Sequence, residues 1–169
     1  GGETAIVGGG VARVFGFEPR VAMLSFSSFG SVKHPLADVI RDAGAVERIC
    51  AAGYGQVALD AVRAALPGLT TSASLTEARL AVYRSLARWP VGKAAYDALQ
   101  VPEDAGKVRV ISPRFIRHVH KAGRRLQAWT IDTEADMQRL LEWGIDGLIS
   151  NRPDVAVRIR DAFLARVRL

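Results

Sequence analysis

Hydrophobic positions along the chain follow two alternating patterns. Short apolar runs bounded by glycine, serine or proline predict buried strands, and apolar residues at three- and four-residue spacing predict helices. The predicted strands are 4–7, 20–26, 49–52, 69–73, 107–111, 126–131 and 145–149. The predicted helices are 36–44, 57–66, 115–123, 133–144 and 153–163, and residues 75–99 are expected to form two helices broken at Trp89-Pro90.

This alternation indicates an α/β fold, because strands buried on both faces and separated by helices are typical of parallel sheets. Two architectures fit: an open doubly wound sheet, or part of a (β/α) barrel with about five or six parallel strands. In both, ligands bind at the carboxyl ends of the strands. Those ends are expected at Ser25–Ser28, Gly53–Gly55, Thr70–Ser72, Thr130–Asp132 and Ser150–Arg152.

Length and composition describe one globular domain. The chain has 169 residues, of which 49% are hydrophobic, so composition excludes disordered, collagen-like and disulfide-rich classes. The single cysteine, Cys50, is expected to be a small buried residue in a reducing compartment, which favours the cytoplasm. No apolar run is long enough for a membrane helix. Gly1 and the lack of a signal-peptide pattern suggest a processed or excised piece of a longer chain.

The net charge of +6 comes from the last third of the chain. Residues 107–169 carry 13 basic and 7 acidic side chains, whereas residues 1–106 carry ten of each. Such a surface attracts phosphate-bearing ligands. The arginines are not interleaved with aromatic residues, which argues against nucleic acid as a partner. Solvated arginine faces are the favoured interpretation.

One segment carries a specific resemblance. It contains a strand ending Trp129-Thr130-Ile131-Asp132, a helix, and the sequence Trp143-Gly-Ile-Asp-Gly-Leu-Ile-Ser-Asn151-Arg152-Pro-Asp154. This arrangement resembles the end of the glycerophosphodiester phosphodiesterase family, which closes with a Trp-Thr-Val-Asn strand, a helix, and a Gly-Val-Asp-Gly-Ile-Thr-Asp-Arg-Pro strand and loop. Weaker similarity covers about residues 35–160. The chain has Asn151 where aspartate is usual and Gly53-Tyr54 where Ser-Phe is usual.

The resemblance implies the second half of a (β/α)8 barrel, with an added N-terminal helix and strand. It implies a hydrolase of lipid metabolism that cleaves a glycerophosphodiester to an alcohol and glycerol 3-phosphate, with a divalent metal, Mg or Ca, polarising the phosphate. The family's first-half motifs, His-Arg-Gly, Glu-x-Asp, His-Asp and Glu-x-Lys, are absent from this sequence. We therefore expect weak or no activity and identify no catalytic residue and no metal ligand. The alternatives are a non-catalytic phosphate- or headgroup-binding module and a recombined relic.

Residues 3–31 resemble a segment of phosphate acetyltransferases and of the related domain of malic enzymes, where a helix leads into a strand with a serine- and glycine-rich end. We therefore predict a boundary between residues 1–34, of different ancestry, and the half-barrel 35–169. Strand 20–26 is expected in place of the family's fourth strand. A half-barrel has two unpaired edges, which predicts a homodimer that closes the barrel.

We expect substrate-binding residues among those that the resemblance and the predicted strand ends have in common. Trp129 is expected to line the substrate cleft, or else to lie in the core. Asp132 could orient a substrate hydroxyl, although a helix N-cap is favoured. Arg152 could pair with a phosphate or form a surface salt bridge, and the sequence favours neither role over the other. Ser27 and Ser28 are further candidates for binding phosphate.

Other chemistry-bearing residues are given structural interpretations. His118 and His120 are two apart on a helix, so they cannot chelate together and are expected on the surface. Lys33 lies too close to the next helix to match the family's lysine well. Gly8–Gly10 resemble the start of a dinucleotide-binding fingerprint, but Arg13 replaces its third glycine, so the signal is weak.

Overall fold

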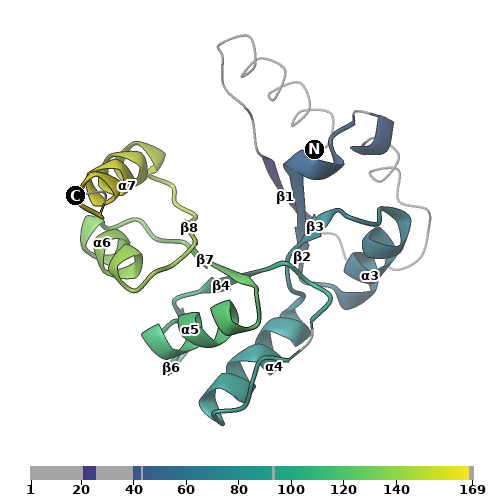
Figure 1. Ribbon diagram of the computed structural model, residues 1–169, viewed down its shortest axis with the longest axis horizontal. Coiled ribbons are helices and arrows are strands. Elements are labelled where there is room, and N and C mark those ends of the chain that lie inside the picture. Colours follow the sequence, from purple (N-terminus) through teal and green to yellow (C-terminus); the bar gives the residue numbers. More distant parts are fainter. Residues whose placement is uncertain (1–20, 26–39, 43, 93, 168–169) are drawn as a thin grey trace. The chain divides into compact units, whose positions relative to one another are not determined.

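The computed structural model describes residues 21–25, 40–42, 44–92 and 94–167 (Figure 1). The chain forms two compact units, Gly1–Glu77 and Ala78–Leu169. In the described part, six strands lie in two parallel three-stranded sheets, one in each unit, and a two-stranded hairpin is added in the second. The predicted alternation of parallel strands and helices is confirmed.

The first unit is built on the sheet order β1-β2-β3, with β1 at Val21–Ser25, β2 at Ile49–Gly53 and β3 at Thr70–Thr71. All pairings are parallel. A single 3-10 turn, η1 (Val46–Arg48), leads into β2, and α3 (Gln56–Ala65) connects β2 to β3.

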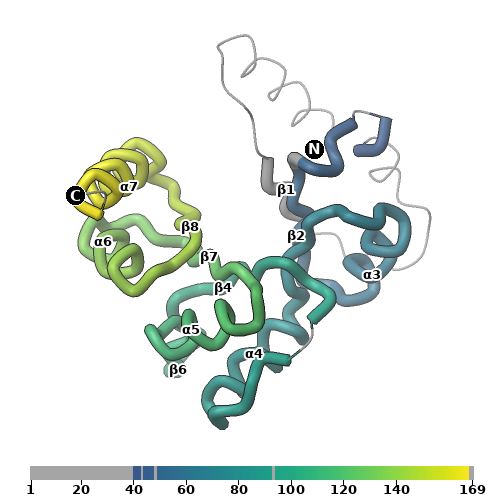
Figure 2. The backbone as a smooth tube through the Cα atoms, in the orientation of Figure 1, coloured from purple at the N-terminus to yellow at the C-terminus, as the bar shows by residue number. Residues whose placement is uncertain are grey.

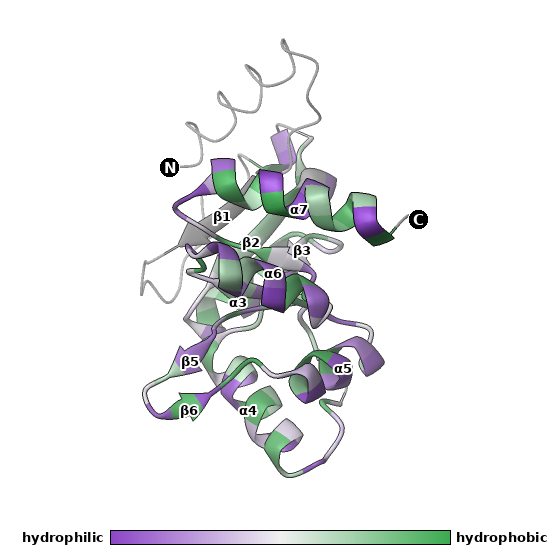
Figure 3. Cartoon of the chain, turned by 90° about the vertical axis from the view of Figure 1, so that its left-hand side faces the viewer, coloured by the Kyte–Doolittle hydropathy of each residue, from purple (hydrophilic) through white to green (hydrophobic). Residues whose placement is uncertain are grey.

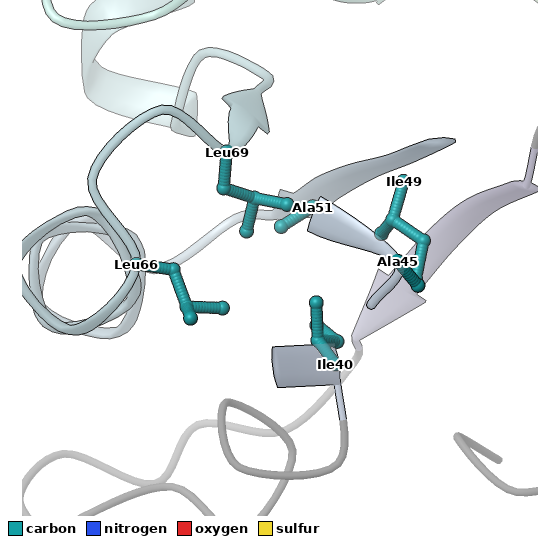
Figure 4. Close-up of a cluster of buried hydrophobic side chains, with 6 residues drawn as sticks. All are labelled: Ile40, Ala45, Ile49, Ala51, Leu66 and Leu69. Atoms are coloured by element: carbon teal, nitrogen blue, oxygen red, sulfur yellow. The ribbon is translucent and has the colours of Figure 1, made fainter. Parts of the chain in front are cut away.

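The core of this unit consists of aliphatic side chains from the segment before β2, from β2 itself and from the segment between α3 and β3 (Figure 4). They face one another and exclude water, which is the main source of stability for so small a unit. The cluster comprises Ile40, Ala45, Ile49, Ala51, Leu66 and Leu69.

A buried polar network holds the start of α4 (Leu75–Leu86). The Ser74 hydroxyl accepts a hydrogen bond from the Glu77 amide at 3.1 Å, and a Glu77 carboxylate oxygen accepts one from the Ser74 amide at 2.8 Å. This reciprocal pair is a capping box. The Arg63 guanidinium donates to both carboxylate oxygens of Glu77, at 3.0 and 3.1 Å, and to the Ser72 carbonyl. The sequence Ser74-x-x-Glu77 before an apolar helix is the pattern typical of this cap.

The second unit contains β4 (Ala98–Pro102), β7 (Arg125–Trp129) and β8 (Gly147–Leu148) in the order β4-β7-β8. Figure 2 traces the chain through the helices that follow these strands: α5 (Pro113–Lys121), α6 (Glu134–Glu142) and α7 (Pro153–Val167). α6 and α7 pack together. Figure 3 shows hydrophobic and hydrophilic residues alternating along α7, as expected of a helix with one buried side.

Burial alternates along β7 with the two-residue period of a strand. Leu126 and Ala128 are completely buried, whereas Gln127 and Trp129 are half-buried on the opposite face. The Gln100 amide on β4 donates to the Gln127 side chain at 2.8 Å across that face. The face of β7 that carries Gln127 therefore also carries Trp129 at the carboxyl end of the strand.

Two predicted elements are wrong. Residues 98–102 form strand β4 rather than the second of two helices in 75–99, because this segment pairs in parallel with β7 along its whole length, and tertiary pairing overrides the helix propensity of alanine and leucine. The strand predicted at 107–111 is limited to β6 (Val108–Arg109), which pairs antiparallel with β5 (Asp104–Ala105). Gly106, with φ of +63°, supplies the left-handed turn between them.

Candidate functional site at the carboxyl ends of β7 and β8

Trp129 is the last residue of β7 and lies opposite Pro102, the last residue of β4. It is half-buried, so it is neither a core tryptophan nor a freely exposed one. Beyond the strands, the backbone ladder continues from Ile131 to Ile149, whose carbonyl accepts the Ile131 amide at 3.0 Å. The loops that follow β7 and β8 are therefore held side by side.

Asp132 joins these two loops through its carboxylate. One oxygen accepts hydrogen bonds from the Ser150 hydroxyl at 2.9 Å and from the Asn151 backbone amide at 2.8 Å. The other accepts from the Asn151 side-chain amide at 2.9 Å. The favoured interpretation of Asp132 as a helix N-cap is wrong, since Thr133 caps α6 by accepting from the Asp136 amide.

The donors around Asp132 stabilise its ionised form. Hydrogen bonds from the Asn151 side chain, the Asn151 amide and the Ser150 hydroxyl, in that order, together with the charge of Arg152, hold the pKa of this carboxyl below its ordinary value. Because both oxygens already accept hydrogen bonds, the carboxylate is better suited to positioning the loop than to abstracting a proton.

Arg152 follows immediately, at the start of α7. Its backbone amide donates to the Ser150 hydroxyl at 2.9 Å, which places it in the same loop. The side chain is 58% exposed, and its Nε lies 3.7 Å from a carboxylate oxygen of Asp154. This distance is too long for a good hydrogen bond. The guanidinium can therefore turn its donors to a phosphate, whose geometry it matches.

Other residues of the same motif have structural roles. Asp146 accepts a hydrogen bond from the Leu126 amide at 2.7 Å and lies 2.8 Å from the His120 ring, so it braces the amino ends of β7 and β8. The Trp143 ring lies 4.7 Å from the Arg139 guanidinium carbon and 5.7 Å from that of Arg109. These contacts stabilise the end of α6.

The remaining candidates divide between described and undescribed parts of the chain. His120 is exposed as predicted, whereas His118 is half-buried. Cys50 lies in β2 and is half-buried rather than fully buried. Ser27, Ser28, Lys33 and Gly8–Gly10 lie outside the described residues.

The residues in the described ranges do not fit the divalent cation that the resemblance implies. Within those ranges, no group of three or more histidine, cysteine, aspartate or glutamate side chains could hold a metal ion. At the carboxyl ends of β7 and β8, the Asp132 carboxylate is already taken up by hydrogen-bond donors. We therefore derive no chemical step through a metal.

The motif at the site agrees with a comparison against known families. Residues 50–155 match the glycerophosphoryl diester phosphodiesterase family. A relative from Mycobacterium tuberculosis, named "Probable glycerophosphodiester phosphodiesterase 2", is 32% identical over 144 residues, which cover 80% of this chain and 52% of the relative. The chain belongs to the glycerophosphoryl diester phosphodiesterase family.

Further similarities agree with this membership. The glycerophosphodiester phosphodiesterase of Bacillus subtilis is 31% identical over 55 residues, 32% of this chain and 19% of its own. The crystal structure of the glycerophosphodiester phosphodiesterase from Agrobacterium tumefaciens has a similar fold, with a TM-score of 0.63, 14% identity, and coverage of 90% of this chain and 60% of its own. The chain spans about half the length of the M. tuberculosis relative. Among the described residues, no helix has the length and apolarity to cross a membrane.

The Asp132–Asn151 contact joins two positions at which this chain differs from the family pattern that it resembles. The family pattern has asparagine after Trp-Thr-Val and aspartate before Arg-Pro, whereas this chain has Asp132 and Asn151 at those positions. The two residues contact each other here. In this chain, the two positions that depart from the pattern of the resemblance hold one carboxylate and one carboxamide in contact with each other.

Proposed function

We propose that this chain is a phosphate-binding member of the phosphodiesterase lineage, whose ligand is a glycerophosphodiester or the phosphate group of one. The observation that carries the proposal is the Asp132 carboxylate, which joins the loops after β7 and β8 and sets the exposed Arg152 at their carboxyl ends. Parallel α/β folds bind ligands at this end of the sheet.

Each proposed residue has one task. Arg152 pairs with the phosphate, because a guanidinium offers two parallel donors to two phosphate oxygens. Trp129, the half-buried last residue of β7, offers an apolar ring to the glycerol or head group. Asp132 positions the loop of Arg152. Ser27 and Ser28, outside the described residues, are retained as further candidates.

Hydrolysis is assigned to the lineage and not to this chain. The sequence lacks the family's His-Arg-Gly, Glu-x-Asp, His-Asp and Glu-x-Lys motifs, which by resemblance supply the acid–base histidines and the carboxylates for Mg or Ca. We therefore propose that the chain is weakly active or inactive. A recombined relic without a selected ligand is the competing interpretation. A cytoplasmic location, inferred from the single cysteine, stays a prediction.

The proposal also includes association of this chain with a second copy of itself. In the described part of the chain, each three-stranded sheet ends in strands that have one hydrogen-bonded neighbour, as β4 and β8 do. Strands with a free edge pair readily with another chain. We propose a homodimer that closes the barrel. Light scattering over a range of concentrations tests it, and a monomer throughout would contradict it.

The catalytic part of the proposal is tested by incubating the chain with glycerophosphocholine or bis(4-nitrophenyl) phosphate, with Mg²⁺ or Ca²⁺ and with EDTA. We expect no more than trace hydrolysis from a folded sample. Efficient metal-dependent turnover that is lost in Trp129→Ala would overturn the non-catalytic assignment and show that this chain completes an active site.

A further inference from the structure

Helix α4 buries small residues and exposes large ones. Ala81 and Ser85 are 2% and 3% exposed, whereas Leu80 and Tyr83 are 49% and 65% exposed. Leu86 and Trp89 follow with exposures of 50% and 67%. A helix of a globular protein ordinarily has the reverse distribution, with its large apolar side chains toward the core.

Three of these residues lie on the exposed side of α4, and the fourth follows its capped end. Leu80, Tyr83 and Leu86 are spaced three residues apart, so each is a neighbour of the next on the helix surface. Trp89 comes three residues after the end of α4, and we call the four residues the strip. Contiguous exposed apolar surface of this kind marks an interaction site more often than a single exposed leucine does.

The end of the strip is fixed in place by the helix cap. The Trp89 amide donates to the Arg84 carbonyl at 2.8 Å, and the Arg88 amide donates to the Ser85 carbonyl at 3.1 Å. Arg88 has a left-handed φ of +61°. These are the features of a Schellman motif, which Pro90 follows. Trp89 is therefore held at the helix end by its backbone, although its ring is exposed.

Basic side chains accompany the strip. Arg79 and Arg88 are both exposed, and Arg79 lies one turn before Tyr83 on the same side of the helix. The single acidic residue of α4, Glu77, is half-buried and bound by Arg63. We call Arg79, Leu80, Tyr83, Leu86, Arg88 and Trp89 the α4 patch.

We propose that the α4 patch docks on the surface of an anionic phospholipid bilayer. Tyrosine and tryptophan rings partition to the boundary between headgroups and acyl chains, where an apolar body and a polar tip are both solvated. Arginines beside them are attracted to anionic headgroups. The exposed side of α4 then lies against the interface, while the side with Ala81 and Ser85 stays packed on the protein.

A second copy of the chain is the weaker occupant. A two-fold contact of the α4 patch with itself would bring Arg79 and Arg88 of both copies into one interface. Glu77 cannot neutralise them, since Arg63 already binds its carboxylate. An anionic bilayer complements the same charges. This inference concerns α4 and goes beyond the phosphate site at Arg152.

Vesicle sedimentation of the full chain tests the inference. The wild type is mixed with vesicles of phosphatidylcholine alone and with vesicles of equal parts phosphatidylcholine and phosphatidylglycerol. We expect binding to the anionic vesicles, weakened by added salt. Trp89→Ser should lower the partition constant about tenfold, and Arg88→Gly about fivefold. Val157→Ser, which removes a 46% exposed apolar side chain from α7, is the matched control and should bind as the wild type does.

Three outcomes would overturn the inference. One is the absence of sedimentation with anionic vesicles by a wild-type sample that circular dichroism shows to be folded. Another is equal binding by the wild type and Trp89→Ser. The third is self-association that Trp89→Ser abolishes, without vesicle binding, which would assign the α4 patch to a second copy of the chain.

Discussion

Asn151 donates two hydrogen bonds to Asp132, one from its backbone amide at 2.8 Å and one from its side-chain amide at 2.9 Å. The contact joins loops that are 19 residues apart in sequence, and it contains the two positions at which asparagine and aspartate are exchanged relative to the family pattern. Aspartate at position 151 alone would place two acceptors in contact, whereas asparagine at position 132 alone would leave a donor and an acceptor.

Exchanging these two residues singly and together should change the unfolding temperature in a predictable order. Asn151→Asp places two carboxylates at hydrogen-bond distance, which disfavours ionisation of both, so it should unfold at a lower temperature than the wild type at neutral pH. Asp132→Asn should be milder, because the Asn151 amide can rotate to accept. The double variant Asp132→Asn/Asn151→Asp restores one carboxylate facing one carboxamide and should recover the wild-type midpoint.

Thermal unfolding of the four proteins at pH 7 and at pH 4 measures this. Acidification should reduce the defect of Asn151→Asp, since protonating one carboxyl removes the repulsion. Additive effects of the two substitutions, with the double variant the least stable, would contradict the coupling between these residues.

We predict that Glu77 contributes to the free energy of unfolding by an amount that depends on pH. Burial raises the pKa of this carboxyl, but hydrogen bonds from Arg63, the Ser74 amide and Gln56 and the Arg63 charge outweigh burial, so the pKa lies below its ordinary value of 4.5. A pKa lowered on folding stabilises the native state above the ordinary value, and this contribution is lost as the pH falls through the folded-state pKa.

Glu77→Gln keeps an acceptor for the capping box and removes the charge that Arg63 binds. Urea unfolding should show the wild type to be more stable than Glu77→Gln by about 1 kcal/mol at pH 7, with the difference disappearing on acidification below pH 4.5. A constant difference from pH 7 to pH 3 would show that the charge of Glu77 contributes nothing.

We predict that replacing Arg88 with glycine stabilises the protein. Its φ of +61° is a conformation that glycine adopts without strain and that costs a residue with a Cβ about 1 kcal/mol. Arg88→Gly should therefore raise the free energy of unfolding by about 0.5–1 kcal/mol. Arg79→Gly, inside the same helix, is the control and should lower it by about 1 kcal/mol. Destabilisation by both substitutions to the same extent would be inconsistent with the observed cap.

The parts of the fold that depend on local pattern could be predicted from the sequence. The apolar runs at β1, β2 and β7 and the spacing in α3, α5 and α6 were sufficient, and so was Thr133 as the start of α6. Strand β4 was not predicted, because its alanine, leucine and glutamine favour a helix and only pairing with β7 makes it a strand.

The same distinction applies to the site. Trp129, Asp132 and Arg152 were selected by motif, and the structure brings the loops of Asp132 and Arg152 together. The role of Asp132 was predicted wrongly, because its partners Ser150 and Asn151 are distant in sequence and no local pattern links them. The exposed strip on α4 was also missed, since periodicity shows that a helix is amphipathic but not which side is covered.

Titration of the chain with sn-glycerol 3-phosphate, followed by calorimetry in the presence of EDTA, tests the proposed phosphate site most directly. We expect saturable binding without a divalent cation, weakened about tenfold in Arg152→Ala because a charge-assisted pair is lost, and unchanged in Arg160→Ala. Arg160 is a suitable control because its side chain is 54% exposed and pairs with Asp161 on α7. Equal affinities in both variants, or no binding by the folded wild type, would contradict the assignment of the phosphate site to the carboxyl ends of β7 and β8.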